Sequence, residues 1–157
     1  MSKISPSQKL KQLGISLPPV PAPAGSYVPC VRTGNLVFVS GQLPFNNGKL
    51  LFRGTVGVEV SVEQAKLAAR EAAVNCLAVL NSQPGGLDAV RRIVKVTGYV
   101  ASSDRFVRQA DVVNGASDFF AEVFGSAGHH SRAAVGAVSL PLGSPVEIEI
   151  VAEAEPA

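Results

Sequence analysis

Residues 146–153 carry the pattern that most limits the fold, because aliphatic and mostly acidic side chains alternate along VEIEIVAE. Successive side chains of a β-strand point to opposite faces of the sheet. One face of this strand would therefore hold Val146, Ile148, Ile150 and Ala152, and the other face Glu147, Glu149, Val151 and Glu153. Such a strand fits a sheet with one face packed on helices and the other turned toward solvent, a partner subunit or a cleft.

Two segments can supply the helices that cover this sheet. In SVEQAKLAAREAAVNCLAVLNS, Ser61 and Gln64 form a candidate capping box. Small side chains recur on one stripe of this helix, which lets it lie close to the sheet. The stripe contains Ala65, Ala68, Ala69, Ala72, Cys76 and Leu80. A second helix is predicted in DRFVRQADVVNGASDFFAEVFG, capped by Asp104 and ending near Gly125.

Short β-rich runs surround these helices. YVPCVRT and NLVFVSGQ are predicted to pair across Gly34-Asn35, GKLLFRG to form a weaker third strand, and RRIVKVTGYVAS to form the strand between the helices. Two closing strands join at a Pro and Gly turn within residues 130–155. The order ββ(β)αβαββ predicts an α+β fold, with a single mixed sheet of five or six strands and two helices packed on one face.

The chain divides into two regions. Residues 1–24 are predicted to form a short helix and a proline-rich arm, because Ser5 can cap, Pro6 suits the first helical position and Gly14 can end the helix. The stretch LPPVPAPAG that follows must be extended, since proline removes backbone donors and fixes φ. Residues 25–157 are predicted to form one domain, as expected for a chain of 157 residues.

The composition favours self-association over nucleic-acid binding. Hydrophobic residues make up 46% of the chain and charged residues only 17%, which leaves little polar cover for a free monomer. The net charge is +2, and the only dense basic cluster is Arg91, Arg92 and Lys95. A nucleic-acid site needs a concentrated basic surface, with aromatic platforms where bases stack, so we do not expect a nucleic-acid partner.

No pattern in the chain predicts a membrane, metal or cofactor site. We find neither a signal-peptide pattern nor a run long enough to cross a bilayer, and expect a cytoplasmic protein without membrane contact. Cys30 and Cys76 fall in a strand and on an apolar helix face, so we expect free thiols. His129 and His130 would point to opposite faces of an extended strand, so we expect no metal site. Motifs for pyridoxal phosphate, phosphate loops and dinucleotides are absent, so no cofactor is expected.

Four stretches, YVPCVRTGNLVFVSGQLP, VKVTGYVAS, VVNGASDFFAEVF and SRAAVGAVSLPLGSPVEIEIVAEAE, span roughly residues 25–155. Together they resemble the reactive intermediate deaminase family, also called the YjgF/YER057c/UK114 family and often labelled endoribonuclease L-PSP. The most specific feature is an arginine that opens a strand, followed at a fixed distance by Leu-Pro and then by Val-Glu-Ile-Glu. The longer N-terminal arm and the sequence around GSAGHHSRAAVG resemble those of a less-studied branch of the family.

The resemblance implies a chorismate-mutase-like homotrimer, in which three sheets enclose a central β-barrel and clefts lie between neighbouring subunits. It also implies hydrolysis of enamines and imines, such as 2-aminoacrylate, to a 2-keto acid and ammonia. The expected ligand is thus a small imine, enamine or keto acid. No cofactor would be needed, because an imine hydrolyses by simple addition of water.

The resemblance also implies site residues. Arg132 would hold the substrate carboxylate, although pattern alone favours an ion pair with a glutamate of the closing strand. Glu147 would position the attacking water, or else would pair across strands. The other expected ligand contacts are Tyr27, Ser40, Gly41, Gln42 and Asn114. Tyr27 could instead be a packing residue, and Asn114 a polar group on a helix surface.

Two positions depart from the family pattern. Ala134 stands where many members have a cysteine, and Gly136 replaces a charged residue common among the deaminases. Three hypotheses follow. The chain could be an enamine/imine deaminase, a non-catalytic trimeric binder or sensor of small carboxylates, or a ribonuclease or translation inhibitor. The first two both require Arg132 to bind a carboxylate, and only turnover separates them.

Overall fold

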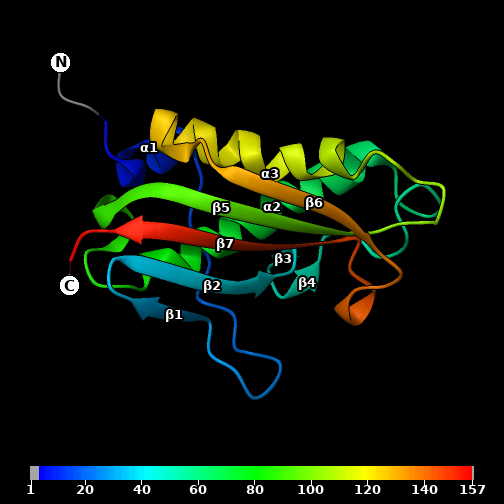
Figure 1. The fold of residues 1–157 in the computed structure, drawn as a ribbon, viewed down its shortest axis with the longest axis horizontal. Helices are drawn as coiled ribbons and strands as arrows, with labels where there is room; N and C mark the ends of the chain where they lie inside the picture. Colours follow the sequence, from blue (N-terminus) through cyan, green and yellow to red (C-terminus); the bar gives the residue numbers. More distant parts are fainter. Residues whose placement is uncertain (1–3, 157) are drawn as a thin grey trace.

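The computed structural model describes residues 4–156 (Figure 1). Residues 1–3, at the start of the predicted region 1–24, and residue 157, at the end of the predicted region 25–157, lie outside the described residues. The helices are α1 Pro6–Gln12, α2 Val62–Asn81 and α3 Gln109–Phe124, with 3₁₀ turns η1 Gly86–Ala89, η2 Gly125–Gly128 and η3 Pro141–Gly143. The strands are β1 Cys30–Thr33, β2 Leu36–Gln42, β3 Phe45–Asn46, β4 Lys49–Leu50, β5 Val90–Ala101, β6 Ser131–Ala137 and β7 Val146–Ala154.

Five strands form one mixed sheet in the order β1-β2-β7-β5-β6. β6 runs parallel to β5, and the other neighbours are antiparallel. Helices α2 and α3 pack against each other on one face of this sheet, and α2 runs behind it in Figure 1. The predicted α+β fold, with one mixed sheet and two helices on one face, is therefore confirmed.

The predicted strand in GKLLFRG does not join the main sheet. Its residues Lys49–Leu50 form β4, which pairs only with β3 in a separate two-stranded sheet. The reason is local, because Asn47 and Gly48 both take positive φ, 50° and 78°, and turn the chain tightly back on itself. The main sheet accordingly has five strands rather than six.

The small-sided face of α2 packs as predicted. Ser61 and Gln64 form the capping box, and every residue of the predicted stripe is buried. Helix α3 also lies close to α2, since a Cβ added at Gly115 of α3 would lie 2.0 Å from the carbonyl oxygen of Lys66 in α2. The two helices therefore form a thin, closely packed layer behind the sheet.

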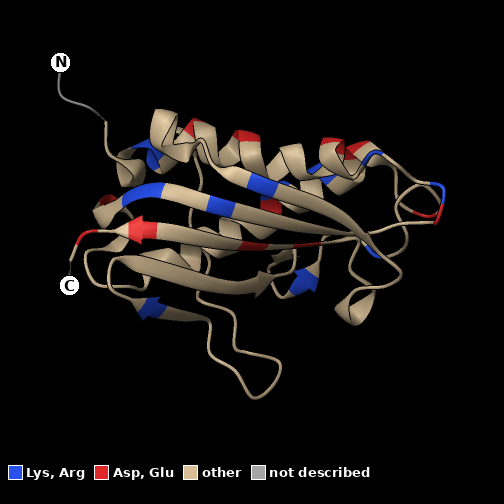
Figure 2. Cartoon of the chain, in the orientation of Figure 1, with Lys and Arg blue, Asp and Glu red and all other residues tan. Residues whose placement is uncertain are grey.

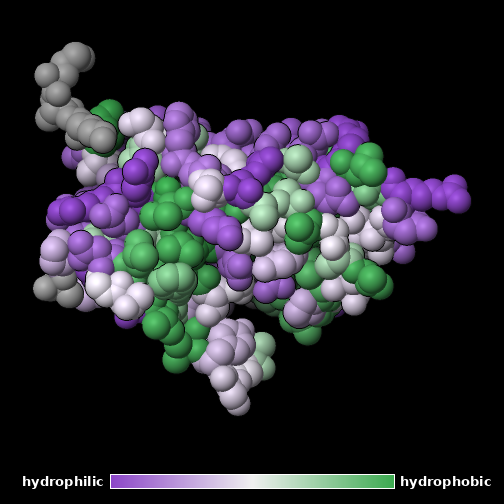
Figure 3. All heavy atoms as spheres, in the orientation of Figure 1, coloured by the Kyte–Doolittle hydropathy of each residue, from purple (hydrophilic) through white to green (hydrophobic). Residues whose placement is uncertain are grey.

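The alternation in β7 is also confirmed. Val146, Ile148, Ile150 and Ala152 are buried against the helix layer, while the glutamates on the opposite face are partly exposed. This opposite face, the open face, carries a hydrophobic patch over β1 and β2 (Figure 3). Phe38 pairs with Val151 on this face and Val31 pairs with Phe38, and both side chains are exposed.

The start of α3 differs from the sequence prediction. The helix begins at Gln109 with Arg108 at its N-terminal cap position, not at Asp104. The residues before it form a turn, in which the Phe106 N–H donates to the Ser103 carbonyl. The Gln109 side chain then donates to the Phe106 carbonyl, 2.8 Å away, so this turn is stabilised without a helix. The predicted end at Gly125 is confirmed.

The N-terminal region is fixed to the body of the protein. Ser5 and Gln8 form a capping box on α1, and Leu10 is buried. Ser5 and Ser7 both donate to the Asp88 carboxylate in η1. The proline-rich arm then crosses from the helix layer to the edge of the sheet at β1 (Figure 1).

Cys30 and Cys76 are free, as predicted. Burial raises the pKa of both thiols, and Cys76 lies completely within the core. Within residues 4–156, the helices are all too short or too polar to cross a membrane.

Candidate functional site

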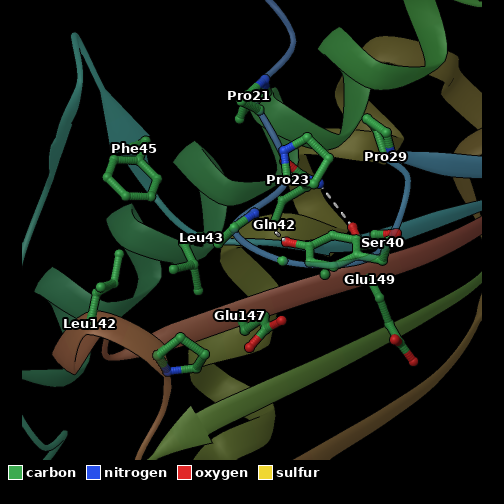
Figure 4. Close-up of a pocket in the computed structure, with 16 residues that line it drawn as sticks. Pro21, Pro23, Pro29, Ser40, Gln42, Leu43, Phe45, Leu142, Glu147 and Glu149 are labelled. Carbon is green, nitrogen blue, oxygen red and sulfur yellow. Dashed lines mark hydrogen bonds between the residues drawn. The ribbon is translucent and has the colours of Figure 1, made fainter.

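A cavity of about 690 Å³ opens beside β7 on the open face. Five of the predicted site residues line it together, namely Tyr27, Ser40, Gly41, Gln42 and Glu147. In Figure 4 the Glu147 carboxyl group lies in the middle of the labelled side chains, with Glu149 farther along the same strand. The structure therefore brings these five predicted residues together around one cavity.

Gly41 is needed because the Glu147 side chain lies directly over it. A Cβ at position 41 would lie 2.0 Å from Glu147 Oε1 and 2.9 Å from its Cδ. The pairing of β2 with β7 shifts register between Val39 and Gln42, so an irregularity in β2 brings this glycine under the carboxylate. The glycine of the SGQ sequence thus makes room for the acidic side chain.

The environment of Glu147 raises the pKa of its carboxyl group. Burial is the main cause, and the negative charge of Glu149 on the same face adds to it. Glu149 in turn accepts a hydrogen bond from the Tyr99 hydroxyl, 3.2 Å away. Burial and the charge of Glu149 also raise the pKa of Tyr99, so its hydroxyl keeps its proton and remains a donor.

The other residues of this cluster make contacts that hold the cavity in shape. Ser40 Oγ donates to the Val28 carbonyl at 2.7 Å, and Gln42 Nε2 donates to the Ser40 carbonyl at 3.0 Å. The Tyr27 hydroxyl accepts a hydrogen bond from the Ala24 N–H at 3.2 Å. These bonds join the end of the arm to β2, and they leave oxygen lone pairs on Ser40 and Tyr27 for a ligand.

Arg132 lies elsewhere, on the edge strand β6. Its Nη1 donates to Asn114 Oδ1 at 2.6 Å and to Ser117 Oγ at 3.2 Å, both on α3. The alternative of an ion pair between Arg132 and a glutamate of the closing strand is wrong, because β5 lies between β6 and β7. Among residues 4–156 the ion pairs are Arg70–Glu122, Arg91–Glu155 and Arg108–Asp111. The charge of Arg132 is therefore not neutralised by a described carboxylate.

His130 and Ser117 extend the support of Arg132. His130 Nδ1 lies 2.6 Å from the Gly128 carbonyl oxygen. A carbonyl oxygen can only accept a hydrogen bond, so Nδ1 must carry a proton and donate it. His130 Nε2 then accepts from Ser117 Oγ, 2.9 Å away. Burial lowers the pKa of His130, which favours this neutral form. Sequence reasoning gave neither residue a role beside Arg132, although Ser117 follows Asn114 by one helical turn and His130 precedes Arg132 by two residues.

The two halves of the candidate site lie on opposite faces of the sheet in one chain. Arg132 pairs with Val96, whose partner in β7 is the core residue Ile150. Glu147 pairs instead with Tyr99, on the open face. Directly paired residues point to the same side of a sheet. A single copy of the chain therefore cannot bring Arg132 and Glu147 onto one small ligand.

The positions that depart from the family pattern follow Arg132 on β6. Ala134 is half-buried and packs against the core, on the same face as Arg132. A Cβ at Gly136 would lie 3.1 Å from both Gln109 Nε2 and Ser102 Oγ, so a charged side chain here would require rearrangement. Across residues 4–156, no three His, Cys, Asp or Glu side chains gather in a group able to hold a metal ion.

Comparison with known proteins gives consistent matches along most of the chain. Protein TCP17 of Trypanosoma cruzi is 41% identical over 145 residues, covering 92% of this chain and 91% of that protein. A protein named 2-iminobutanoate/2-iminopropanoate deaminase, from Dermatophagoides farinae, is 30% identical over 138 residues, with 87% and 92% covered. The crystal structure of Atu1372 from Agrobacterium tumefaciens, whose function its description calls unknown, superimposes with a TM-score of 0.87 at 45% identity, covering 96% and 92% of the two chains.

The sequence pattern of one family, described as "YjgF/chorismate mutase-like, putative endoribonuclease", matches residues 7–154. The match includes all of α1 except Pro6, the arm and every strand of the main sheet. A match over this much of the chain, together with the fold, establishes the family. The chain belongs to the YjgF/chorismate mutase-like family.

Proposed function

We propose that this protein hydrolyses 2-imino acids and their enamine tautomers to 2-keto acids and ammonia, without a cofactor, where two copies of the chain meet. The observation that carries the proposal is a pair of complementary groups. Glu147 is a partly buried carboxylate with a raised pKa, next to a cavity. Arg132 is a firmly held guanidinium with no described carboxylate partner. The first suits proton transfer, and the second suits an anionic substrate.

Arg132 would bind the substrate carboxylate through two parallel hydrogen bonds. Its Nη1 is fixed from α3 by Asn114 and Ser117, so the guanidinium is oriented before the ligand arrives. Both partners are neutral oxygens, which orient the cation without cancelling its charge. Such preorganisation lowers the entropy cost of binding and places the imine carbon in one position.

Glu147 would act as a general base toward a water molecule. The substrate enters as the N-protonated imine, and the Glu147 carboxylate takes one proton from water as the water oxygen bonds to the imine carbon and the C=N electron pair moves to nitrogen. Protonated Glu147 then gives this proton to the amino nitrogen. As the C–N bond breaks and the C=O bond forms, Glu147 takes the hydroxyl proton and passes it to the departing ammonia, which leaves as ammonium. A raised pKa favours the proton uptake of the first step, because a base works best with a pKa near the working pH.

Two copies are required because the halves lie on opposite faces of one sheet. The open face already carries the hydrophobic patch that includes Val31 and Phe38, and covering this patch would stabilise an assembly. We therefore place Arg132 of one copy opposite Glu147 of the next, in a closed ring of three. A closed ring leaves each interface with one complete pair.

The relative from Dermatophagoides farinae supports this reaction by its name, 2-iminobutanoate/2-iminopropanoate deaminase. The family description instead mentions an endoribonuclease. The basic residues are spread over several elements rather than gathered in one dense surface (Figure 2). An RNA-cleaving protein is expected to gather its basic residues along one groove, so this distribution does not favour RNA cleavage.

The first test generates 2-aminoacrylate in situ with a serine dehydratase and follows pyruvate release. Wild-type protein should accelerate release, and Arg132→Ala should reduce kcat/KM by about 30-fold or more, because the substrate carboxylate loses its charged hydrogen-bond partner. Arg105→Ala is the matched control, because Arg105 is exposed in the turn before α3. Failure of the wild type to accelerate release, or equal activity in Arg132→Ala, would refute the proposal.

Mixing two inactive variants tests the shared site directly. Arg132→Ala and Glu147→Gln are unfolded and refolded together, so that copies of both kinds assemble. If each site takes Arg132 and Glu147 from different copies, about one site in four regains both groups and activity returns to about a quarter of wild type. If both groups acted within one copy, the mixture would stay inactive.

A further inference from the structure

The cavity beside Glu147 is larger and more apolar than a three-carbon imino acid requires. Its volume of about 690 Å³ falls in the middle of the range for sites that enclose much larger ligands. Among the described residues that line it, only Glu147 and Glu149 carry charge. Its apolar lining includes Pro21, Pro23, Leu43, Phe45, Pro141 and Leu142.

One wall of the cavity is the proline-rich arm, which is held at both ends. Before the arm, α1 is docked through buried Leu10 and through the Asp88 carboxylate. At its far end, the Ala24 N–H donates to the Tyr27 hydroxyl. Pro18, Pro19, Pro21 and Pro23 restrict the backbone between these anchors. An extended proline-rich segment loses little entropy when it is ordered, so this wall is largely preformed.

The opposite wall is fixed from within the helix layer. Asn75 on α2 is almost completely buried, and its Nδ2 donates to the carbonyl oxygens of Leu43 and Phe45, at 2.8 and 3.0 Å. These bonds hold the segment between β2 and β3 in place, with both apolar side chains turned to the cavity lining. In Figure 4, Leu43, Phe45 and Leu142 lie on the same side of Glu147.

The charges of the two halves of the site indicate which part of the substrate each half binds. The cavity lining has no cationic side chain among the described residues, so it offers nothing to a carboxylate. The two glutamates would repel a second acidic group on the substrate. The substrate carboxylate therefore belongs with Arg132, and the cavity is left for the remainder of the molecule.

We infer that the cavity receives the substrate side chain, and that the preferred substrates are 2-imino acids with uncharged, branched or aromatic apolar side chains. This inference rests on the proposed function, because it assigns the carboxylate to Arg132. The arm is then a specificity-determining wall of the site rather than a loose extension.

Binding of stable keto acids tests the inference without turnover. Calorimetry on the wild-type protein should show 4-methyl-2-oxopentanoate binding about tenfold or more tightly than pyruvate, because each additional buried methylene contributes strongly in an apolar pocket. The acidic 2-oxoglutarate should bind more weakly than 4-methyl-2-oxopentanoate by a similar factor. Equal affinity for pyruvate and 4-methyl-2-oxopentanoate, or tightest binding of 2-oxoglutarate, would overturn the inference.

A pair of variants at Leu142 sharpens the test. Leu142 lines the cavity but is 58% exposed, so its replacement leaves the core intact. Leu142→Lys adds a cation to the lining and should shift preference toward 2-oxoglutarate by about tenfold relative to Leu142→Met, which keeps the size and polarity. Identical preferences in the two variants would show that this wall does not meet the side chain, against the inference.

Turnover separates the inference from the proposed function. Imines are generated from leucine and from alanine by an amino-acid oxidase with catalase, and their loss is followed. A tenfold binding preference without catalysis would refute the proposed hydrolysis but support the apolar specificity. Equal turnover of both imines, with equal binding of both keto acids, would support hydrolysis and refute the specificity.

Discussion

The half of the site around Glu147 and the half around Arg132 are built in opposite ways. Glu147 lies partly buried beside a cavity whose walls come from the arm and from the segment between β2 and β3. Arg132 lies exposed at the sheet edge, held by hydrogen bonds from α3. The first half changes the chemistry of its group, and the second only fixes its direction. Under the proposed mechanism, proton transfer and substrate recognition would therefore belong to opposite faces of one sheet.

Replacing the base should have the largest effect. Glu147→Gln keeps the shape of the side chain but removes proton uptake, so kcat should fall by about 10²- to 10⁴-fold. Binding of a keto acid should change much less, because Arg132 lies outside this half. Steady-state kinetics together with calorimetry check both parts. Equal losses in kcat and in keto-acid affinity would show that Glu147 contributes to binding as much as to proton transfer.

Filling the space under the base should have the next largest effect. The methyl group of Gly41→Ala would overlap Glu147 Oε1 and displace the carboxylate. We expect kcat to fall by about 100-fold, since a shift of about 1 Å in a reacting group can cost that much. The overlap falls on a side chain, so the melting temperature should change little.

A double variant shows whether Gly41 acts through Glu147. In the Glu147→Gln background, Gly41→Ala should reduce kcat only slightly further, because the displaced group no longer reacts. A further 100-fold loss in this background would assign Gly41 an independent role, such as backbone contact with the ligand.

Removing the second carboxylate should shift the pH dependence. The charge of Glu149 raises the pKa of Glu147, and Glu147 must be deprotonated to act as a base. Glu149→Gln should therefore lower the pKa of Glu147 and move the acid limb of the kcat profile to lower pH. Tyr99→Phe is the control, because it keeps the charge of Glu149 and loses only the hydrogen bond. An acid limb at the same pH in Glu149→Gln would contradict this assignment.

Weakening the support of Arg132 should have the smallest effect. Ser117→Ala removes one of the two acceptors of Nη1 and leaves Asn114 in place. One hydrogen bond of this kind corresponds to a change of about 2- to 10-fold, which should appear as a higher KM with kcat retained. Ser126→Ala, an exposed serine in η2, is the matched control. A fall in kcat without a change in KM would place Ser117 in the chemistry instead.

The main elements could be predicted because their signals are local. The capping box at Ser61, the stripe of small residues on α2 and the alternation in β7 each depend on neighbours a few positions away. The start of α3 could not be predicted from Asp104, because a turn stabilised by the Gln109 side chain replaces the first helical turn. The side chain involved belongs to the helix itself, so composition gives no warning of it.

The sequence indicated candidate site residues one by one, but it did not indicate how they are arranged. Resemblance indicated both Arg132 and Glu147, yet the face that Arg132 occupies depends on the register between β6 and β5. A shift of one residue would move the arginine to the open face, and sequence alone does not fix the register of a parallel edge strand. The cavity walls were missed because Pro21, Leu43 and Leu142 come from segments far apart in the chain.

The position of β7 in the middle of the sheet also determines the order in which the strands can pair as the chain leaves the ribosome. β7 is the last strand in sequence order, but it separates the hairpin of β1 and β2 from β5 and β6. A nascent chain on the ribosome can form α2 early, whereas the hairpin has no partner strand until β7 emerges. The apolar hairpin thus stays exposed until β7 has left the ribosome, and the main sheet closes only after its other four strands have been made.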